Sequence, residues 1–209
     1  MLDKYVRAAR AVRFEDKRKR AFFENLDWAA LEADLGRVSG VCERVRSPVV
    51  FCHNDLLPGN ILVLGGRERP ETPDDLTFID FEYSSYNHRG FDFGNHWNEY
   101  AGLACDYSRY PTPEAQERFA RAYLAAGPGG ERPSPSDAAA VPAASVAQLV
   151  AEGNAFSLAS HFLWAIWAII QARYSTIDFD YFGYFEVRVA EMRRRLPEVE
   201  AMVDAMARP

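Results

Sequence analysis

Polar side chains stand at two places in the sequence where a buried apolar strand is expected to end. The segment FCHNDLLPGN contains His53, Asn54 and Asp55 in a row, and Asn60 closes it. A later apolar segment, LTFIDFE, contains Asp80. Buried groups of these types lose hydration and need hydrogen-bond partners in return. Such side chains can take a proton from an attacking hydroxyl group and hold Mg²⁺ on the phosphates of a nucleotide.

A β-hairpin would bring these side chains together. We expect NILVLGG and LTFIDFE to form two strands joined by the polar, proline-containing loop between them. In a hairpin over residues 61–79, Asn60 and Asp80 emerge side by side at one end. Asp55 would then act as the catalytic base, with Asn60 and Asp80 as magnesium ligands.

The order and spacing of these residues match the protein kinase motif H-R-D-x-x-x-x-N followed by D-F-G. Here the residues are HNDLLPGN followed by IDFE, with the same four residues between Asp55 and Asn60. Alone, each of these residues is more often a turn former or a surface acid. The ordered set at this spacing favours phosphoryl transfer.

The remaining segments predict helices around the hairpin. Between Asp27 and Arg46, apolar residues recur at steps of three and four, which indicates an amphipathic helix. VVFCH is expected to form a buried strand. Further helices are predicted for residues 1–24, GFDFGNHWNEYAGL, TPEAQERFARAYLAAG, residues 145–174 and residues 180–196, the last ended by Pro197. The expected fold class is therefore α+β, mostly α-helical around a small β-hairpin.

Composition excludes several classes of protein. The 209 residues are 48% hydrophobic and carry a net charge of −6, so we expect a folded core and no nucleic-acid partner. Three cysteines without metal-type spacing indicate reduced thiols in a cytoplasmic compartment. The N-terminal residues lack a secretory signal pattern. The most apolar stretch, Ala155–Ile170, is shorter than the ~20 residues that span a bilayer, so we expect a buried helix and no transmembrane segment.

One face of the long predicted helix combines indole rings with polar groups. At about 100° per residue, six such side chains fall within about 120° of arc. They are Ser157, Ser160, His161, Trp164, Trp167 and Gln171. Tryptophans at helical spacing are usually core residues. Indole faces, together with an acid such as Glu99, are also suited to binding a small ammonium group.

Three long segments carry a resemblance to a known family. VFCHNDLLPGNIL, FIDFEYSSYNHRGFDFGNHWNEYAG and LASHFLWAIWAIIQARYSTIDFDYF resemble the choline/ethanolamine kinase family, which has a kinase-like fold distinct from protein kinases. The similarity extends over residues 26–196, interrupted only near residues 127–145. Within the family, NEYAG and YSTIDFDYF are more similar to ethanolamine kinases than to choline kinases.

The resemblance implies a protein-kinase-like C-terminal lobe of the choline kinase type. It also implies ATP-dependent, Mg²⁺-requiring phosphorylation of ethanolamine to phosphoethanolamine in the cytoplasm, the first step of the CDP-ethanolamine route to phosphatidylethanolamine. Choline kinase is the alternative activity. A related small-molecule kinase, such as an aminoglycoside phosphotransferase, is a weaker alternative, because GFDFGNHWNEYAG and LASHFLWAIWAII argue against it.

Matching positions give each candidate residue a role. The resemblance implies that Asp55 is the catalytic base, that Asn60 and Asp80 are the magnesium ligands, and that His53 and Glu82 support the site. The residues that match the walls of the amine pocket are Tyr83, Glu99, Tyr107, Trp164, Trp167, Phe179 and Tyr184.

The rest of the sequence sets the expected domain organisation. Residues 1–25 are expected to be a helical segment, residues 26–196 the kinase-like lobe with a flexible loop at 127–145, and residues 197–209 a tail. Kinases of this shape also hold the nucleotide with a glycine-rich loop and a lysine. The sequence contains no G-x-G-x-x-G, and its three lysines lie in the first 19 residues. We therefore expect the nucleotide lobe to be absent and the chain alone to be catalytically incomplete, with homodimerisation left open.

Overall fold

The computed structural model describes residues 2–66, 69–70, 72, 75–126 and 133–206. The helices, in chain order, are α1 (Leu2–Ala11), α2 (Lys17–Glu24), α3 (Trp28–Arg44), α4 (Arg89–Glu99), α5 (Pro113–Ala126), α6 (Pro135–Ala140), α7 (Ala143–Tyr174) and α8 (Tyr181–Met206). The strands are β1 (Val49–Cys52), β2 (Ile61–Val63), β3 (Leu76–Phe78) and β4 (Ser85–His88).

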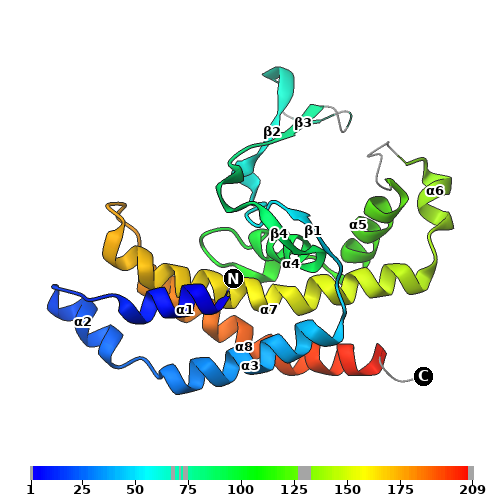
Figure 1. The fold of residues 1–209 in the computed structure, drawn as a ribbon. Helices are drawn as coiled ribbons and strands as arrows, with labels where there is room; N and C mark the ends of the chain where they lie inside the picture. The colour runs from blue at the N-terminus through cyan, green and yellow to red at the C-terminus, as the bar shows by residue number, and fades with distance from the viewer. Residues whose placement is uncertain (1, 67–68, 71, 73–74, 127–132, 207–209) are drawn as a thin grey trace.

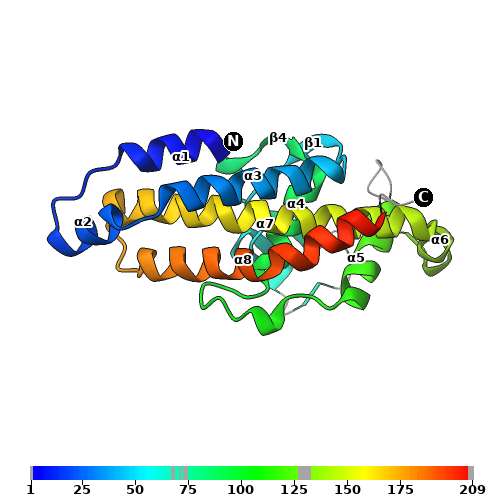
Figure 2. The ribbon, with the colours of Figure 1, turned by 90° about the horizontal axis from the view of Figure 1, so that it is seen from below.

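Helix α7 is the central element of the fold. Figure 1 shows it running through the molecule below α4, β1 and β4, and Figure 2 shows α1, α3 and α8 lying alongside it. Residues 151–166 are buried without a break, as expected for a helix that is apolar on nearly all sides. By length and composition α7 could cross a membrane, but 83% of its most apolar window is buried inside the protein. The predicted buried helix is therefore confirmed.

Helix α4 packs so closely against α7 that the backbones of the two helices are almost in contact. A Cβ atom added to Gly94 would lie 2.6 Å from the carbonyl oxygen of Gly153 and closer still to the backbone nitrogen of Ser157. On the facing helix, a Cβ atom added to Gly153 would overlap the ring of Trp97. Since no side chain fits at either position, these glycines set the spacing of the two helices.

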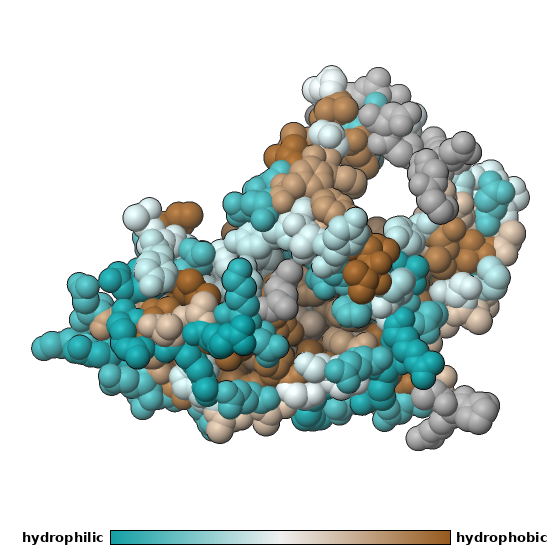
Figure 3. Space-filling model, in the orientation of Figure 1, coloured by the Kyte–Doolittle hydropathy of each residue, from teal (hydrophilic) through white to brown (hydrophobic). Residues whose placement is uncertain are grey.

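Two small antiparallel sheets hold the polar loops. Strand β2 pairs with β3, with Ile61 opposite Phe78, which confirms the predicted hairpin. Strand β1 pairs with β4, with Phe51 opposite Tyr86. Strand β4 was not predicted, because SYNH lacks the apolar alternation of a strand. The β2–β3 hairpin stands away from the helices (Figure 1) and carries exposed apolar residues, brown in Figure 3.

The prediction that Pro197 ends the last helix is wrong. Helix α8 continues through Pro197 to Met206, so residues 197–206 are helical rather than a tail. A proline inside a helix costs about 3 kcal/mol. On both sides of it, Leu196, Val199 and Val203 are buried, and each buried aliphatic side chain contributes about 1.5–3 kcal/mol. Packing therefore outweighs the local cost.

Two further expected boundaries also differ from the structure. Within the loop expected at 127–145, Ser134 and Asp137 form a capping box that starts α6, and α7 begins at Ala143; residues 127–132 lie outside the described part of the chain. The N-terminal helical segment is divided into α1 and α2. Val12 and Phe14, between them, are buried in the core, so the break serves tertiary packing.

We predict that Gly94→Ala lowers the free energy of unfolding by about 3 kcal/mol or more, because the new methyl group meets backbone that cannot rotate away. Gly36→Ala is the matched control: Gly36 lies on the exposed side of α3, with nothing within 4 Å of an added Cβ atom. It should stabilise by about 0.5–1 kcal/mol. Urea unfolding curves measure both changes, and equal midpoints for the two variants would contradict the close packing.

Candidate active site

A cavity of about 300 Å³ gathers most of the predicted site residues. It lies between the loop after β1, helix α4, the second half of α7 and the start of α8. The lining residues are Asp55, Leu57, Glu82, Tyr83, Glu99, Leu103, Trp164, Trp167, Ile177, Phe179, Tyr181 and Tyr184. A carboxylate that could act as a base therefore shares one cavity with the aromatic residues predicted to bind an amine.

The loop that carries Asp55 is fixed to helix α4 by one carboxylate. Asp92 accepts hydrogen bonds from the backbone nitrogens of His53 and Asn54, at 2.8 and 2.6 Å. Asn54 has φ of +66°, a left-handed conformation that asparagine tolerates better than most residues. Its side chain donates to the Tyr83 carbonyl oxygen at 2.9 Å. Asn54 and Asp92 therefore determine the path of the loop.

His53 connects this loop to the end of the hairpin. Its Nε2 lies 2.9 Å from the Ile79 carbonyl oxygen, and its Nδ1 lies 3.3 Å from the backbone nitrogen of Asp55. The first contact requires a proton on Nε2, and the second requires a lone pair on Nδ1. His53 therefore occupies a bracing position outside the cavity wall.

Asp55 is buried at the base of the cavity, 9% exposed. The Asn60 amide nitrogen lies 2.9 Å from its carbonyl oxygen and 3.2 Å from its Oδ2. Burial raises the pKa of Asp55 to about 6, and the charges of Glu99 and Asp80 add to the rise while His53 and Asn60 oppose it. The carboxylate is thus ionised at neutral pH but close enough to titration to accept a proton.

Asn60 and Asp80 meet at the base of the hairpin, as predicted. The Ile79 nitrogen donates to the Asn60 carbonyl oxygen at 3.1 Å. Asp80 is exposed, has φ of +64°, and makes no hydrogen bond or ion pair with the described residues. An amide oxygen and an unpaired carboxylate suit Mg²⁺, which takes one or two protein oxygens together with substrate phosphates.

The described ranges contain no cluster of three or more His, Cys, Asp or Glu side chains that could hold a metal ion. A metal at Asn60 and Asp80 therefore needs oxygens from a bound nucleotide. The donor set fits Mg²⁺ held in that way.

The aromatic wall is built edge to face. The ring of Trp164 lies 5.3 Å from that of Tyr83 and 5.5 Å from that of Trp167, within the range of favourable aromatic pairs. Both indole N–H groups are occupied: Trp164 donates to Asn95 Oδ1 at 2.6 Å and Trp167 to the Tyr83 hydroxyl at 3.1 Å. The orientation of the indole rings is therefore fixed before any ligand binds.

Glu99 and Tyr184 line the same cavity and share a buried partner. Arg188 donates to Glu99 Oε1 at 3.3 Å and to the Tyr184 hydroxyl at 3.1 Å. Tyr107, predicted for the pocket, is not in the cavity wall. Its ring lies behind the wall against buried His161, with ring centroids 5.2 Å apart.

Sequence reasoning did not single out several residues that position the site, among them Asp92, Asn95 and Arg188. A signal exists for two of them. Asn95 falls on the apolar side of α4, and Arg188 interrupts the apolar side of α8, where a charge must find a partner. Asp92 gave no comparable signal, because an acid in the first turn of a helix is commonplace.

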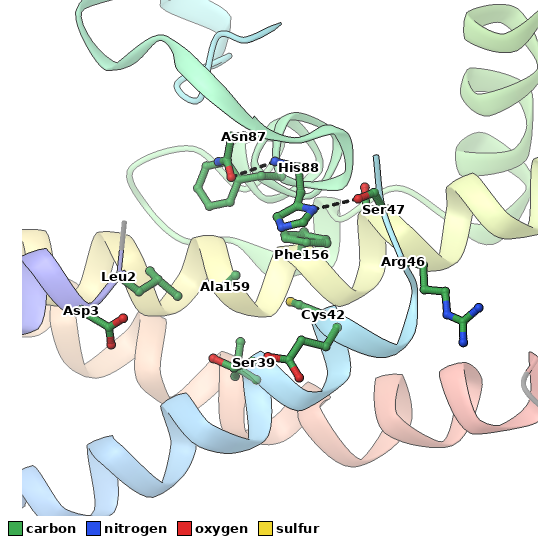
Figure 4. Close-up of a pocket in the computed structure, with 13 residues that line it drawn as sticks. Leu2, Asp3, Ser39, Cys42, Arg46, Ser47, Asn87, His88, Phe156 and Ala159 are labelled. Carbon is green, nitrogen blue, oxygen red and sulfur yellow. Dashed lines mark hydrogen bonds between the residues drawn. The ribbon is translucent and has the colours of Figure 1, made fainter. Parts of the chain in front are cut away.

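A second cavity, of about 290 Å³, lies between α1, α3, β4 and α7 (Figure 4). His88 Nδ1 lies 2.8 Å from the Ser47 carbonyl oxygen at its edge. None of the predicted site residues lines this cavity. The Asp55 cavity is therefore the candidate active site.

Comparisons with known proteins agree with this geometry. A sequence model described as choline/ethanolamine kinase matches residues 1–193. A probable ethanolamine kinase of Arabidopsis thaliana is 42% identical over 96% of this chain and 50% of its own length. Ethanolamine kinase 2 of Mus musculus is 44% identical over 82% of this chain and 41% of its own length. The chain thus spans half or less of the length of these relatives.

A solved structure supports the fold as well. An ethanolamine kinase of Plasmodium vivax superposes with a TM-score of 0.75 at 30% identity, over 96% of this chain and 49% of that one. The predicted α+β, kinase-like C-terminal lobe is thereby confirmed. With the Asp55 loop, the hairpin and the aromatic cavity in this arrangement, the chain belongs to the choline/ethanolamine kinase family.

Proposed function

We propose that this chain supplies the catalytic base, the metal ligands and the amine pocket of an ethanolamine kinase. The reaction is transfer of the γ-phosphoryl group of ATP to the hydroxyl group of ethanolamine, which gives phosphoethanolamine for phosphatidylethanolamine synthesis. One observation carries the proposal: Asp55 lies in the same cavity as two indole rings and Glu99. A base and an ammonium pocket in one cavity fit an amino alcohol.

The roles follow from the chemistry of each group. The ammonium group of ethanolamine contacts the faces of Trp164 and Trp167 and donates to Glu99. Its hydroxyl group then reaches Asp55, which takes the proton as the phosphoryl group is transferred. Asn60 holds Asp55 in place through its amide nitrogen.

Asn60 and Asp80 are the residues that would hold Mg²⁺. When bound, the ion neutralises charge on the nucleotide phosphates. On the hairpin beside these residues, the side chains of Leu62 and Phe78 are 41% and 47% exposed. Exposed apolar side chains next to the metal ligands support the binding of ATP, and of a lobe that covers it, on this side.

Choline is the alternative substrate. The wall contains six aromatic residues beside its acids, and aromatic faces with a nearby negative charge suit a quaternary ammonium group. Ethanolamine is favoured because Glu99 offers an acceptor to its N–H donors, and because the two relatives described above carry that name. The second alternative is a lobe that binds the amine but cannot transfer phosphate alone.

We place the protein in the cytoplasm, on the basis of its cysteines. Cys42, Cys52 and Cys105 are all free thiols, which is typical of a reducing compartment. Burial raises the pKa of Cys42 and Cys52 to about 12, so neither is a reactive thiolate.

We predict that phosphoryl transfer requires Asp55. The chain, fused to the nucleotide-binding lobe of a related kinase, should phosphorylate ethanolamine with ATP and Mg²⁺, whereas the unfused chain should stay near background. In the fused protein, Asp55→Asn should lower kcat ~10²–10⁴-fold, the usual effect of losing a positioned base. Turnover of the variant within a few-fold of the parent would show that Asp55 is not the base.

We predict that the same substitution stabilises the fold at neutral pH. Because the pKa of Asp55 is raised from 3.8 to about 6, ionisation of Asp55 destabilises the folded state above pH 6. Most of this penalty is lost by pH ~4, where the folded state is protonated and the unfolded state is close to its own pKa. Two pKa units correspond to about 2.7 kcal/mol, but the cavity is open to solvent, so a gain of about 1–2 kcal/mol is expected.

Urea unfolding of both proteins at pH 7 and pH 4, with EDTA to remove metal ions, measures this gain. A gain as large at pH 4 as at pH 7, or a loss at pH 7, would contradict the assigned cause.

We predict that Asp80→Ala raises the Mg²⁺ requirement of the fused protein by about tenfold or more, since it removes a ligand carboxylate from an ion that carries phosphate charge. Asp178→Ala is the matched control, because it removes an exposed acid from the loop before α8, away from the hairpin. Rate measured against Mg²⁺ concentration gives the result. Superimposable curves for Asp80→Ala and the parent would count against the assigned ligand.

A further inference from the structure

Arg188 is a buried charge that touches the amine cavity without lining it. It is 1% exposed. Its Nη1 donates to Glu99 Oε1 and to the Tyr184 hydroxyl, and its Nη2 donates to Ser160 Oγ at 3.3 Å. Of these partners, Glu99 and Tyr184 line the cavity. Arg188 therefore connects two residues of the pocket wall from behind.

Within the described part of the chain, Glu99 is the one acid paired with Arg188. His161, close by, is fully buried, and burial followed by the charges of Arg188, Arg195 and Arg194 lowers its pKa well below the usual range, so it is neutral. A buried guanidinium needs a counter-charge, and removal of either partner leaves an uncompensated charge. Glu99 thus supplies the negative charge that balances the buried Arg188 guanidinium group.

The pair leaves half of the Glu99 carboxylate free. Arg188 engages Oε1 at 3.3 Å, and no described residue donates to Oε2. Since Glu99 lines the cavity, Oε2 is the acceptor available to a ligand. Arg188 thereby fixes the direction in which that acceptor faces.

An ion pair attracts a third charge differently from a bare carboxylate. The guanidinium cancels most of the long-range pull of Glu99, so what remains is a short-range, directional hydrogen-bond acceptor. A primary ammonium group, with three N–H donors, can use such an acceptor, whereas a quaternary ammonium group cannot.

We propose that Arg188 is a positioning residue that sets the preference of this pocket for a primary over a quaternary ammonium group, by holding Glu99 Oε1 and leaving Oε2 for an N–H donor. The inference rests on the proposed function, because it assigns the cavity to an amine. It adds a residue that never touches the substrate.

The test is direct amine binding to the 209-residue chain, followed by tryptophan fluorescence, since Trp164 and Trp167 line the cavity. Ethanolamine and choline are each titrated into the parent, Arg188→Met and Arg188→Lys. Arg188→Met should weaken ethanolamine about tenfold, the effect of losing one charge-assisted hydrogen bond. Choline should bind no more weakly than to the parent, because the full charge of Glu99 is released and choline makes no hydrogen bond that could be lost, so the ratio of ethanolamine to choline affinity falls. Arg188→Lys should restore part of the parent's ratio of ethanolamine to choline affinity. Lysine returns the positive charge but not the paired N–H donors of the guanidinium group.

Arg195→Met is the matched control for a merely structural effect. Arg195 lies two turns further along α8, is also buried, and donates to Asn154 and Ser157 without contacting the cavity. Its loss should lower stability but leave the affinity ratio unchanged.

A double-mutant cycle shows whether Arg188 affects amine binding through Glu99. In a Glu99→Gln background, Arg188→Met should change ethanolamine affinity less than about twofold. This double variant has no unpaired buried charge. If Arg188→Met does not fold, the double variant and Arg188→Lys are used for the test instead.

The outcomes separate the two proposals. If neither amine binds the parent chain, the proposed function fails and the inference fails with it. If both bind and the ratio is unchanged in the Arg188 variants, or shifts equally in Arg195→Met, the inference is overturned while the proposed function stands.

Discussion

The contact between α4 and α7 is the constraint on which the rest of the site depends. At Gly94 and Gly153 the two helices approach so closely that a methyl group would overlap backbone or an indole ring. Helix α4 carries Asp92, which fixes the Asp55 loop, and Glu99, which lines the cavity. Because both side chains stand on one helix held at one distance from α7, the Asp55 loop and the aromatic cavity wall keep their relative positions.

The same interface contains a polar network inside an apolar core. Asn95 accepts from Ser160 and Trp164, and Asn98 donates to the carbonyl oxygen of Ser157. Such groups cost free energy on burial unless they are paired. The bonds that are made lock the register of the two helices, since sliding by one residue would break several of them together, although Asn95 Nδ2 and Asn98 Oδ1 are buried without a partner among the described residues. Trp164, 7% exposed, thus belongs both to this core and to the cavity wall.

Two of the four described non-glycine residues with positive φ lie at the same site. Asn54 and Asp80 both have positive φ, a conformation that costs non-glycine residues about 1 kcal/mol or more. Asp55 is buried, and this burial raises its pKa. Surrounding contacts such as those of Asp92 and His53 must supply the energy that keeps these groups in place. The site is therefore less stable than its packing alone would allow, as is common for groups arranged to react.

The sequence by itself determined the fold class, the hairpin and the proximity of Asp55, Asn60 and Asp80. Those features depend on local patterns, namely apolar periodicity, turn residues and a short motif. Because a hairpin brings its two ends together, residues at the ends of that motif must lie close in space. The long motifs also located most of the cavity wall.

Only the tertiary structure decided the features that depend on contacts between distant segments. Pro197 lies inside α8 because buried neighbours outweigh its local cost. Strand β4 exists because β1 lies beside it. Tyr107 packs behind the wall, while Arg188, 89 residues from Glu99 in the chain, holds the wall in place. No spacing rule predicts such pairs, because their energy comes from the shared burial of groups that meet only after the chain has folded.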